Sequence, residues 1–122
     1  MPPPYRLLIV DDQPGFLALA REMLTAQRQF EVVGTAPDGE SALAVAAESS
    51  PDVVVVDVFM PGINGFQTAR RLRDAHPSLK IVVVSAEGYP DHPRLAREAG
   101  AIGFLDKRDL RPHRLLQLLQ QA

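Results

Sequence analysis

The chain has 122 residues, of which 46% are hydrophobic and 23% charged, and its formal net charge is −2. This length corresponds to one domain with its own core, and the small negative charge gives no electrostatic reason to bind nucleic acid directly. Because cysteine is absent, disulfides, thiolate nucleophiles and thiolate metal sites are excluded. We predict a single domain over residues 1–122, with residues 1–4 as a flexible tail and no effector domain.

The start of the chain does not have the pattern of a secretory signal. Residues 1–5 read Met-Pro-Pro-Pro-Tyr, without a basic head or an apolar stretch. No apolar run in the sequence approaches the length of a bilayer span. We therefore expect a cytoplasmic protein that does not contact membranes.

The first half of the chain predicts three strands and two helices. Residues 7–10 form an apolar run without polar alternation, which is typical of a strand buried on both faces. Pro14 then suits the first turn of a helix. Residues 30–36 predict a weaker strand, Asp38 can cap a second helix, and residues 53–56 repeat the buried apolar run.

The second half continues the alternation of strands and helices. Its expected segments are, in order, a turn at 60–65, a helix carrying Phe66, Ala69 and Leu72, a strand at 81–84, a Gly- and Pro-rich stretch at 88–93, a helix from Arg94 to Ala99 that stops at Gly100, a strand at 102–105, and a helix opened by Asp109 and Pro112. Five strands that alternate with five helices through short connections predict an α/β fold with a parallel sheet covered on both faces.

Polar residues follow four of the five strands. They are Asp11 and Asp12 after the first strand, Asp57 after the third, Ser85 after the fourth, and Lys107, through Asp106, after the fifth. Because the carboxyl ends of parallel strands meet at one edge of a sheet, where such folds bind ligands, we expect these side chains to lie together. Acids, a hydroxyl and an amine are a set suited to phosphate and magnesium. Of 13 cationic residues, only Lys80 and Lys107 are lysine.

These segments resemble the receiver domain of bacterial response regulators. The resemblance spans the chain from Tyr5 onward and is carried by Asp11-Asp12, by Asp57 in Val-Asp-Val-Phe-Met-Pro-Gly-Ile-Asn-Gly, by Ser85-Ala86, and by Gly103-Phe104-Leu105-Asp106-Lys107. It implies a flavodoxin-like, doubly wound sheet of five parallel strands in the order 2-1-3-4-5, with five helices. In that order the ligand site lies between strands one and three.

The resemblance also implies the chemistry of the site. Asp57 would accept a phosphoryl group from a sensor histidine kinase or a phosphotransfer protein. Mg²⁺ would be held by Asp12, Asp57 and the backbone carbonyl of Phe59, with Asp11 binding it directly or through water. The chain would then be a signalling switch and not an enzyme beyond its own phosphoryl transfer and autodephosphorylation.

Three further residues are expected to stabilise the phosphate and to transmit the signal. Lys107 would contact a phosphoryl oxygen and Ser85 would donate its hydroxyl to the phosphate. Ser85 and Phe104 would then move together and alter the surface formed by the fourth helix, the fifth strand and the fifth helix. Arg108, where the family often has proline, favours the subgroup with a C-terminal helix-turn-helix.

The output and the oligomeric state follow less directly from the residues. We expect the signal to reach an effector domain or a partner protein. A phosphorylation-dependent homodimer through the fourth and fifth helices is a further expectation, with charges that could pair across it at Arg94, Arg97, Asp106, Asp109 and Arg111.

Two other classes of function fit the sequence less well than the switch. One is a receiver-like interaction module that is never phosphorylated, against which the intact set of acids, hydroxyl and lysine argues. The other is an enzyme on the same fold: Asp11 and Asp12 would repel a flavin phosphate, and Phe59 stands where a related hydrolase would need a second acid. The three histidines, His76, His92 and His113, lack ligand spacing and are expected at the surface.

Overall fold

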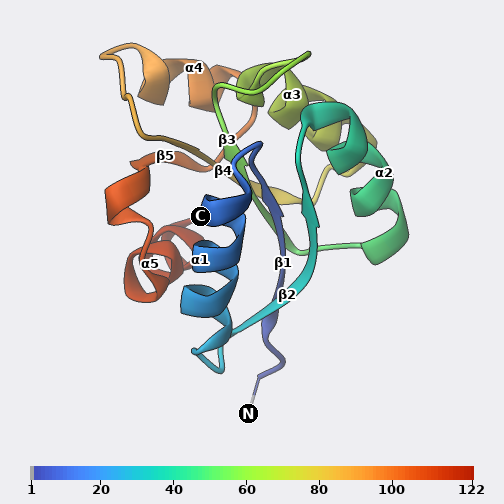
Figure 1. The fold of residues 1–122 in the computed structure, drawn as a ribbon, viewed down its shortest axis with the longest axis vertical. Helices are drawn as coiled ribbons and strands as arrows, with labels where there is room; N and C mark the ends of the chain where they lie inside the picture. Colours follow the sequence, from blue (N-terminus) through green and yellow to red (C-terminus); the bar gives the residue numbers. More distant parts are fainter. Residues whose placement is uncertain (1) are drawn as a thin grey trace.

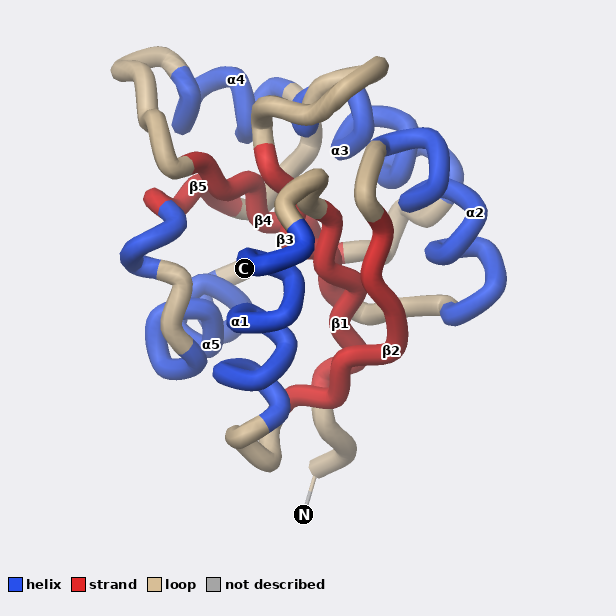
Figure 2. Tube along the Cα trace, in the orientation of Figure 1, coloured by secondary structure: helices blue, strands red, loops and turns tan. Residues whose placement is uncertain are grey.

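Strands and helices alternate along the chain in this computed structural model, which describes residues 2–122 (Figure 1). The elements are β1 (Tyr5–Val10), α1 (Pro14–Thr25), β2 (Phe30–Ala36), α2 (Gly39–Ser49), β3 (Val53–Asp57), α3 (Gly65–Ala75), β4 (Lys80–Ser85), α4 (His92–Glu98), β5 (Gly103–Asp106), the 3-10 helix η1 (Lys107–Asp109) and α5 (Pro112–Gln121). All strand pairs are parallel, and the order β2-β1-β3-β4-β5 confirms the prediction. Figure 2 shows the strands in red between helices that cover both faces.

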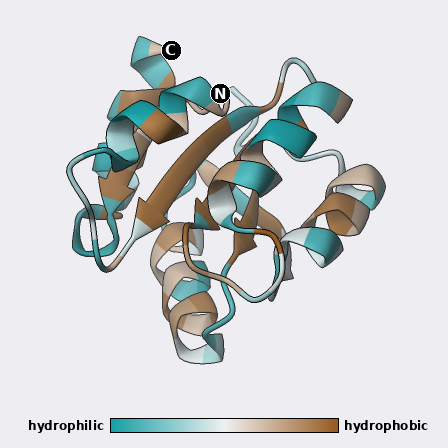
Figure 3. Cartoon of the chain, turned by 90° about the horizontal axis from the view of Figure 1, so that it is seen from above, coloured by the Kyte–Doolittle hydropathy of each residue, from teal (hydrophilic) through white to brown (hydrophobic). Residues whose placement is uncertain are grey.

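The sheet separates two hydrophobic cores. Successive side chains of a strand point to opposite faces, so the continuous apolar runs supply both sides at once. In β1, Leu7 and Ile9 pack in the core that α1 and α5 cover, whereas Leu8 and Val10 pack in the core that α2, α3 and α4 cover. Figure 3 shows the result as hydrophobic strands between helices that are hydrophobic on one side only.

Helix ends largely follow the predicted signals. Asp38 accepts a hydrogen bond from the Ser41 N–H and so caps α2, as predicted. Gly100, with φ of +94°, follows α4 and confirms the expected stop. The prediction for Asp109 is wrong: it ends η1, and α5 begins only at Pro112. The cause is Asp106, whose side chain accepts the Arg108 N–H and starts the 3-10 turn three residues earlier.

The first residues of the chain precede β1. Residues 2–4 are exposed and have no regular structure, and Met1 lies outside the described residues. Within residues 2–122, every helix is too short or too polar to cross a bilayer.

Gly65 packs directly against the backbone at the end of β3. It is the first residue of α3, its N–H donates to the Val58 carbonyl at 2.9 Å, and a Cβ there would overlap the Asp57 carbonyl. We expect Gly65→Ala to lower the free energy of unfolding by about 1–3 kcal/mol, measured by urea denaturation. Gly15→Ala is the control, because no atom lies within 4 Å of a Cβ at this exposed position. Equal midpoint shifts for the two variants would contradict this account.

Candidate functional site

Three acids gather at the carboxyl edge of the sheet. Asp11 and Asp12 follow β1, Asp57 ends the neighbouring β3, and one carboxylate oxygen from each lies within 4.8 Å of the others. Asp11 is 0% exposed and Asp57 5%, whereas Asp12 faces solvent. The structure therefore brings together the three acids that the sequence predicted.

Lys107 supplies the positive charge of the site. Its Nζ lies 2.6 Å from Asp11 Oδ2 and 3.5 Å from Asp57 Oδ1, and its side chain is 11% exposed. The ammonium also lies 4.2 Å from the centroid of the Phe16 ring, an attractive cation–π geometry. Sequence analysis assigned no part in the site to Phe16, because a phenylalanine at helical spacing is ordinarily a core residue.

The two oxygens of Asp11 have different surroundings. Oδ1 accepts a hydrogen bond from the Gln13 N–H at 2.9 Å, which orients the carboxylate at the start of α1. Oδ2 is buried and is paired with the Lys107 ammonium, whose Nζ lies 2.6 Å away. A buried carboxylate oxygen that faces a cation in this way is also of the type that binds a hard metal ion.

Burial raises the pKa of Asp57 from its ordinary 3.8 to about 6, with the negative charge of Asp11 as the next cause. Lys107 opposes both effects, and Asp12 adds a smaller repulsion. The pocket thus holds more negative charge than one ammonium offsets. Hard divalent cations such as Mg²⁺ take oxygen ligands, so the donor set of Asp11, Asp12 and Asp57 fits such an ion.

Ser85 and Phe104, at the end of β4 and in β5, contact partners other than the acids. Ser85 is fully buried; its hydroxyl donates to the Glu87 carbonyl at 3.0 Å and accepts from the Glu87 N–H at 3.2 Å. Phe104 is half-buried and packs with the core beneath α4. The hydroxyl that the sequence analysis assigned to a phosphate is therefore engaged by the loop after β4.

The segment that carries Phe59 is held by backbone hydrogen bonds on both sides. The Val58 N–H donates to the Val84 carbonyl at 3.0 Å, and the Gly65 N–H donates to the Val58 carbonyl at 2.9 Å. These bonds fix the backbone directly after Asp57. The Phe59 side chain itself is 51% exposed.

The prediction that all three histidines lie at the surface is wrong for His92. His113 is exposed and His76 half-buried, but His92 is only 5% exposed among aromatic rings. No sequence pattern indicates this burial, because a single histidine in a Gly- and Pro-rich stretch has no periodic pattern. Its burial depends on how the loop after β4 folds back over α3.

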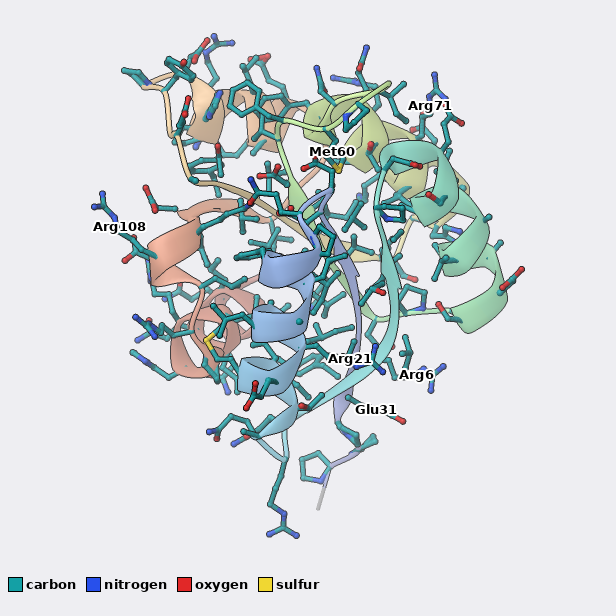
Figure 4. All side chains as sticks on the ribbon, in the orientation of Figure 1. Arg6, Arg21, Glu31, Met60, Arg71 and Arg108 are labelled. Carbon is teal, nitrogen blue, oxygen red and sulfur yellow. The ribbon has the colours of Figure 1, made fainter. Side chains whose placement is uncertain are left out.

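Several other cations lie away from the acids. Figure 4 shows Arg108 extending outward from η1, and its Nε lies 3.4 Å from Asp106 Oδ1. Arg6 lies beside Glu31 at the opposite end of the sheet, with 3.8 Å between Nη1 and Oε2. Lys107 is thus placed differently from its immediate neighbour in the chain.

Comparison with known proteins agrees with this arrangement. The family described as response regulator receiver domain matches residues 7–120. The chain belongs to this family. This receiver domain is 34% identical over 119 residues to the nitrate/nitrite response regulator protein NarL of Escherichia coli K12, a match that covers 98% of this chain and 55% of that protein. The chain therefore spans about half the length of this curated relative.

Solved structures show the same fold. The receiver domain of the putative response regulator NarL from Mycobacterium tuberculosis superposes with a TM-score of 0.88 and 32% identity, covering 98% of this chain and 97% of that one. The CheX–CheY–BeF3–Mg²⁺ complex from Borrelia burgdorferi matches with a TM-score of 0.84 and 25% identity, covering 97% and 88%. The flavodoxin-like fold predicted from the sequence is confirmed.

The raised pKa of Asp57 predicts how the stability of the metal-free receiver domain depends on pH. Because the pKa is about 6 in the folded chain against an ordinary 3.8, the unfolded chain loses this proton first. The protonated Asp57 carboxyl makes its full contribution to the free energy of unfolding below pH 3.8. This contribution is lost as the pH rises through about 6, and the free energy of unfolding falls by about 3 kcal/mol in all.

Urea denaturation with a chelator across this pH range would measure the effect. Asp57→Asn should remove this part of the pH dependence and stabilise the metal-free protein at neutral pH. Asp74→Asn, at an exposed position of α3, is the matched control. A parent protein and an Asp57→Asn variant with the same pH profile would refute the prediction.

Proposed function

We propose that this receiver domain is a phosphorylation-controlled switch in which Asp57 accepts a phosphoryl group from a phosphohistidine of a sensor kinase or phosphotransfer protein. The observation that carries the proposal is the position of Lys107 Nζ, 2.6 Å from Asp11 and 3.5 Å from Asp57. A buried carboxylate beside a lone ammonium is suited to a nucleophile whose product carries additional negative charge.

The transfer forms one bond and breaks one. A carboxylate oxygen of Asp57 attacks phosphorus and forms the O–P bond, while the N–P bond of the donor breaks. The electron pair of that bond stays on the imidazole nitrogen of the donor, which ends as a neutral imidazole after exchanging protons with solvent. With a pKa of about 6, Asp57 is mostly ionised at neutral pH and therefore nucleophilic.

We propose that Mg²⁺ is bound by Asp11, Asp12, Asp57 and the backbone carbonyl of Phe59. When bound, the ion would neutralise charge on the phosphoryl oxygens. Lys107 would hold one of these oxygens from the side of α1 and α5, where its ammonium rests on Phe16. Support comes from the three clustered carboxylates, two of them buried, which together carry more negative charge than Lys107 offsets.

The switch would begin at Ser85. In the proposed sequence its hydroxyl leaves Glu87 and donates to a phosphoryl oxygen, which moves the loop after β4. Phe104 then turns inward, and the surface formed by α4, β5 and α5 changes. An interaction module that is never phosphorylated is less favoured, because burying Asp11, Asp57 and Lys107 together costs desolvation energy that a binding surface does not require.

The whole protein and its output also belong to the proposal. We take residues 1–122 as a single receiver domain that acts in the cytoplasm. Since the relative NarL is about twice as long, an effector domain of the helix-turn-helix kind that regulates transcription is one route of output, and a partner protein is the other. In this proposal phosphorylation also promotes a homodimer through α4 and α5. Arg94, one of the charges expected to pair across it, lies 2.9 Å from Glu98 within its own helix.

Phosphorylation of the isolated chain is directly measurable. With Mg²⁺ and acetyl phosphate, we expect intact-mass spectrometry to show one added phosphoryl group. The adduct should be absent without the metal and in Asp57→Asn, but present in the control Asp74→Asn. An adduct that persists in Asp57→Asn would assign the phosphoryl group to another residue.

The two lysines of the chain form a matched pair for testing the ammonium. We expect Lys107→Met to slow adduct formation by about 10²-fold, the usual effect of removing a group that stabilises developing negative charge. Lys80→Met is the control, because Lys80 Nζ lies 3.5 Å from the Leu119 carbonyl at the end of α5. Initial rates of phosphorylation would give the comparison, and equal rates for both variants would exclude the proposed role of Lys107.

A further inference from the structure

A buried histidine lies between the loop that follows the acceptor and the aromatic residue of β5. The His92 ring is surrounded by the rings of Phe59, Phe66, Tyr89 and Phe104, with centroid distances of 5.8, 5.4, 5.2 and 5.5 Å. These four rings come from the loop after β3, from α3, from the loop after β4 and from β5. One imidazole at the start of α4 therefore links the loop that follows the acceptor to the loop after β4 and to β5.

The ring geometry makes this contact directional. The planes of Phe66, Tyr89 and Phe104 meet the imidazole at 64°, 77° and 62°, which are edge-to-face arrangements. Aromatic pairs favour such arrangements over parallel stacking. His92 is 5% exposed and Phe66 and Phe104 are half-buried, so rotation of either of these two rings requires the imidazole to follow or the contact to break. The Phe59 ring is 51% exposed and contacts the imidazole from the loop after β3.

His92 also holds the loop after β4. The Tyr89 N–H donates to His92 Nδ1 at 3.3 Å, and the His92 N–H donates to the Tyr89 carbonyl at 3.0 Å. At the other end of the same loop, the Ser85 hydroxyl bonds to Glu87. Because the proposed switch breaks the contact between Ser85 and Glu87, the bonds between His92 and Tyr89 still connect the loop to α4 when the Ser85 contact is lost.

We propose that His92 is a positioning residue that couples the ring of Phe59, two residues after the acceptor, to the ring of Phe104 on the output surface. This inference rests on the proposed function, since it describes how phosphorylation of Asp57 reaches α4. The coupling acts through the packed imidazole and through its Nδ1 bond to the loop. It supplies a second path besides the movement of Ser85.

The first test uses the parent protein and no substitution. Beryllium fluoride with Mg²⁺ is added as a phosphoryl mimic, and NMR follows the His92 ring, the Tyr89 amide and the Val58 amide next to the acceptor. We expect all three to change with the same midpoint, while the exposed His113 ring stays unchanged. A Val58 response without a His92 response overturns the coupling and leaves the proposed function standing. No response at any of them overturns both.

The second test measures coupling by a double-mutant cycle. Phe59→Ala and Phe104→Ala, alone and together, are compared for the affinity of beryllium fluoride in the presence of Mg²⁺. In the parent background we expect the combined effect to differ from the product of the single effects by about threefold or more. In a His92→Ala background, the effect of the double variant on this affinity should equal the product of the two single effects.

Two further variants separate coupling from simple packing. His92→Phe keeps an aromatic ring and should retain part of the coupling, whereas His113→Ala should leave the cycle as in the parent. Multiplicative effects already in the parent background, or unchanged coupling in His92→Ala, would overturn the inference. If His92→Ala does not fold, the His92→Phe cycle and the NMR test of the parent still decide.

Discussion

The attraction between one ammonium and two buried carboxylates is the interaction on which the rest of this receiver domain depends. Lys107 faces Asp11 and Asp57 where water is largely excluded, so each charge strongly affects the others. Burial and the nearby acid raise the pKa of Asp57, and Lys107 limits that rise enough to leave the carboxylate ionised at neutral pH. The pocket therefore carries a net negative charge, and the Asp57 carboxylate in it is still a nucleophile. Both properties suit a site that takes up a metal and a phosphoryl group.

The pleat of the strands divides this chemistry between the two faces of the sheet. Asp11 and Asp57 continue the alternation of Ile9 and Val55, which face α1 and α5, and Lys107 reaches them from the same side. Ser85 continues the alternation of Val83, which faces α3 and α4. Asp11, Asp57 and Lys107 thus lie toward one layer of helices, and Ser85, which would report the phosphate, lies toward the other. A shift of one residue in β4 would reverse this arrangement.

Much of the fold and the set of acids could be predicted, because both follow from local patterns. Apolar runs gave the strands, and their carboxyl ends gave Asp11, Asp12 and Asp57. The partners of Ser85 and Phe16 could not be predicted, since a hydroxyl or a ring does not reveal its contact until the loops are packed. His92 was misplaced for the same reason: its burial depends on rings from four separate segments.

The ring of Phe16 beneath Lys107 has a consequence for the strength of the site. An acid or an amide in that place would fix the ammonium equally well, but would draw part of its charge away from the pocket. An aromatic face attracts the cation while carrying no net charge of its own. The first turn of α1 can thus support the lysine without adding a further negative charge to a pocket in which Asp11 and Asp57 already face the ammonium.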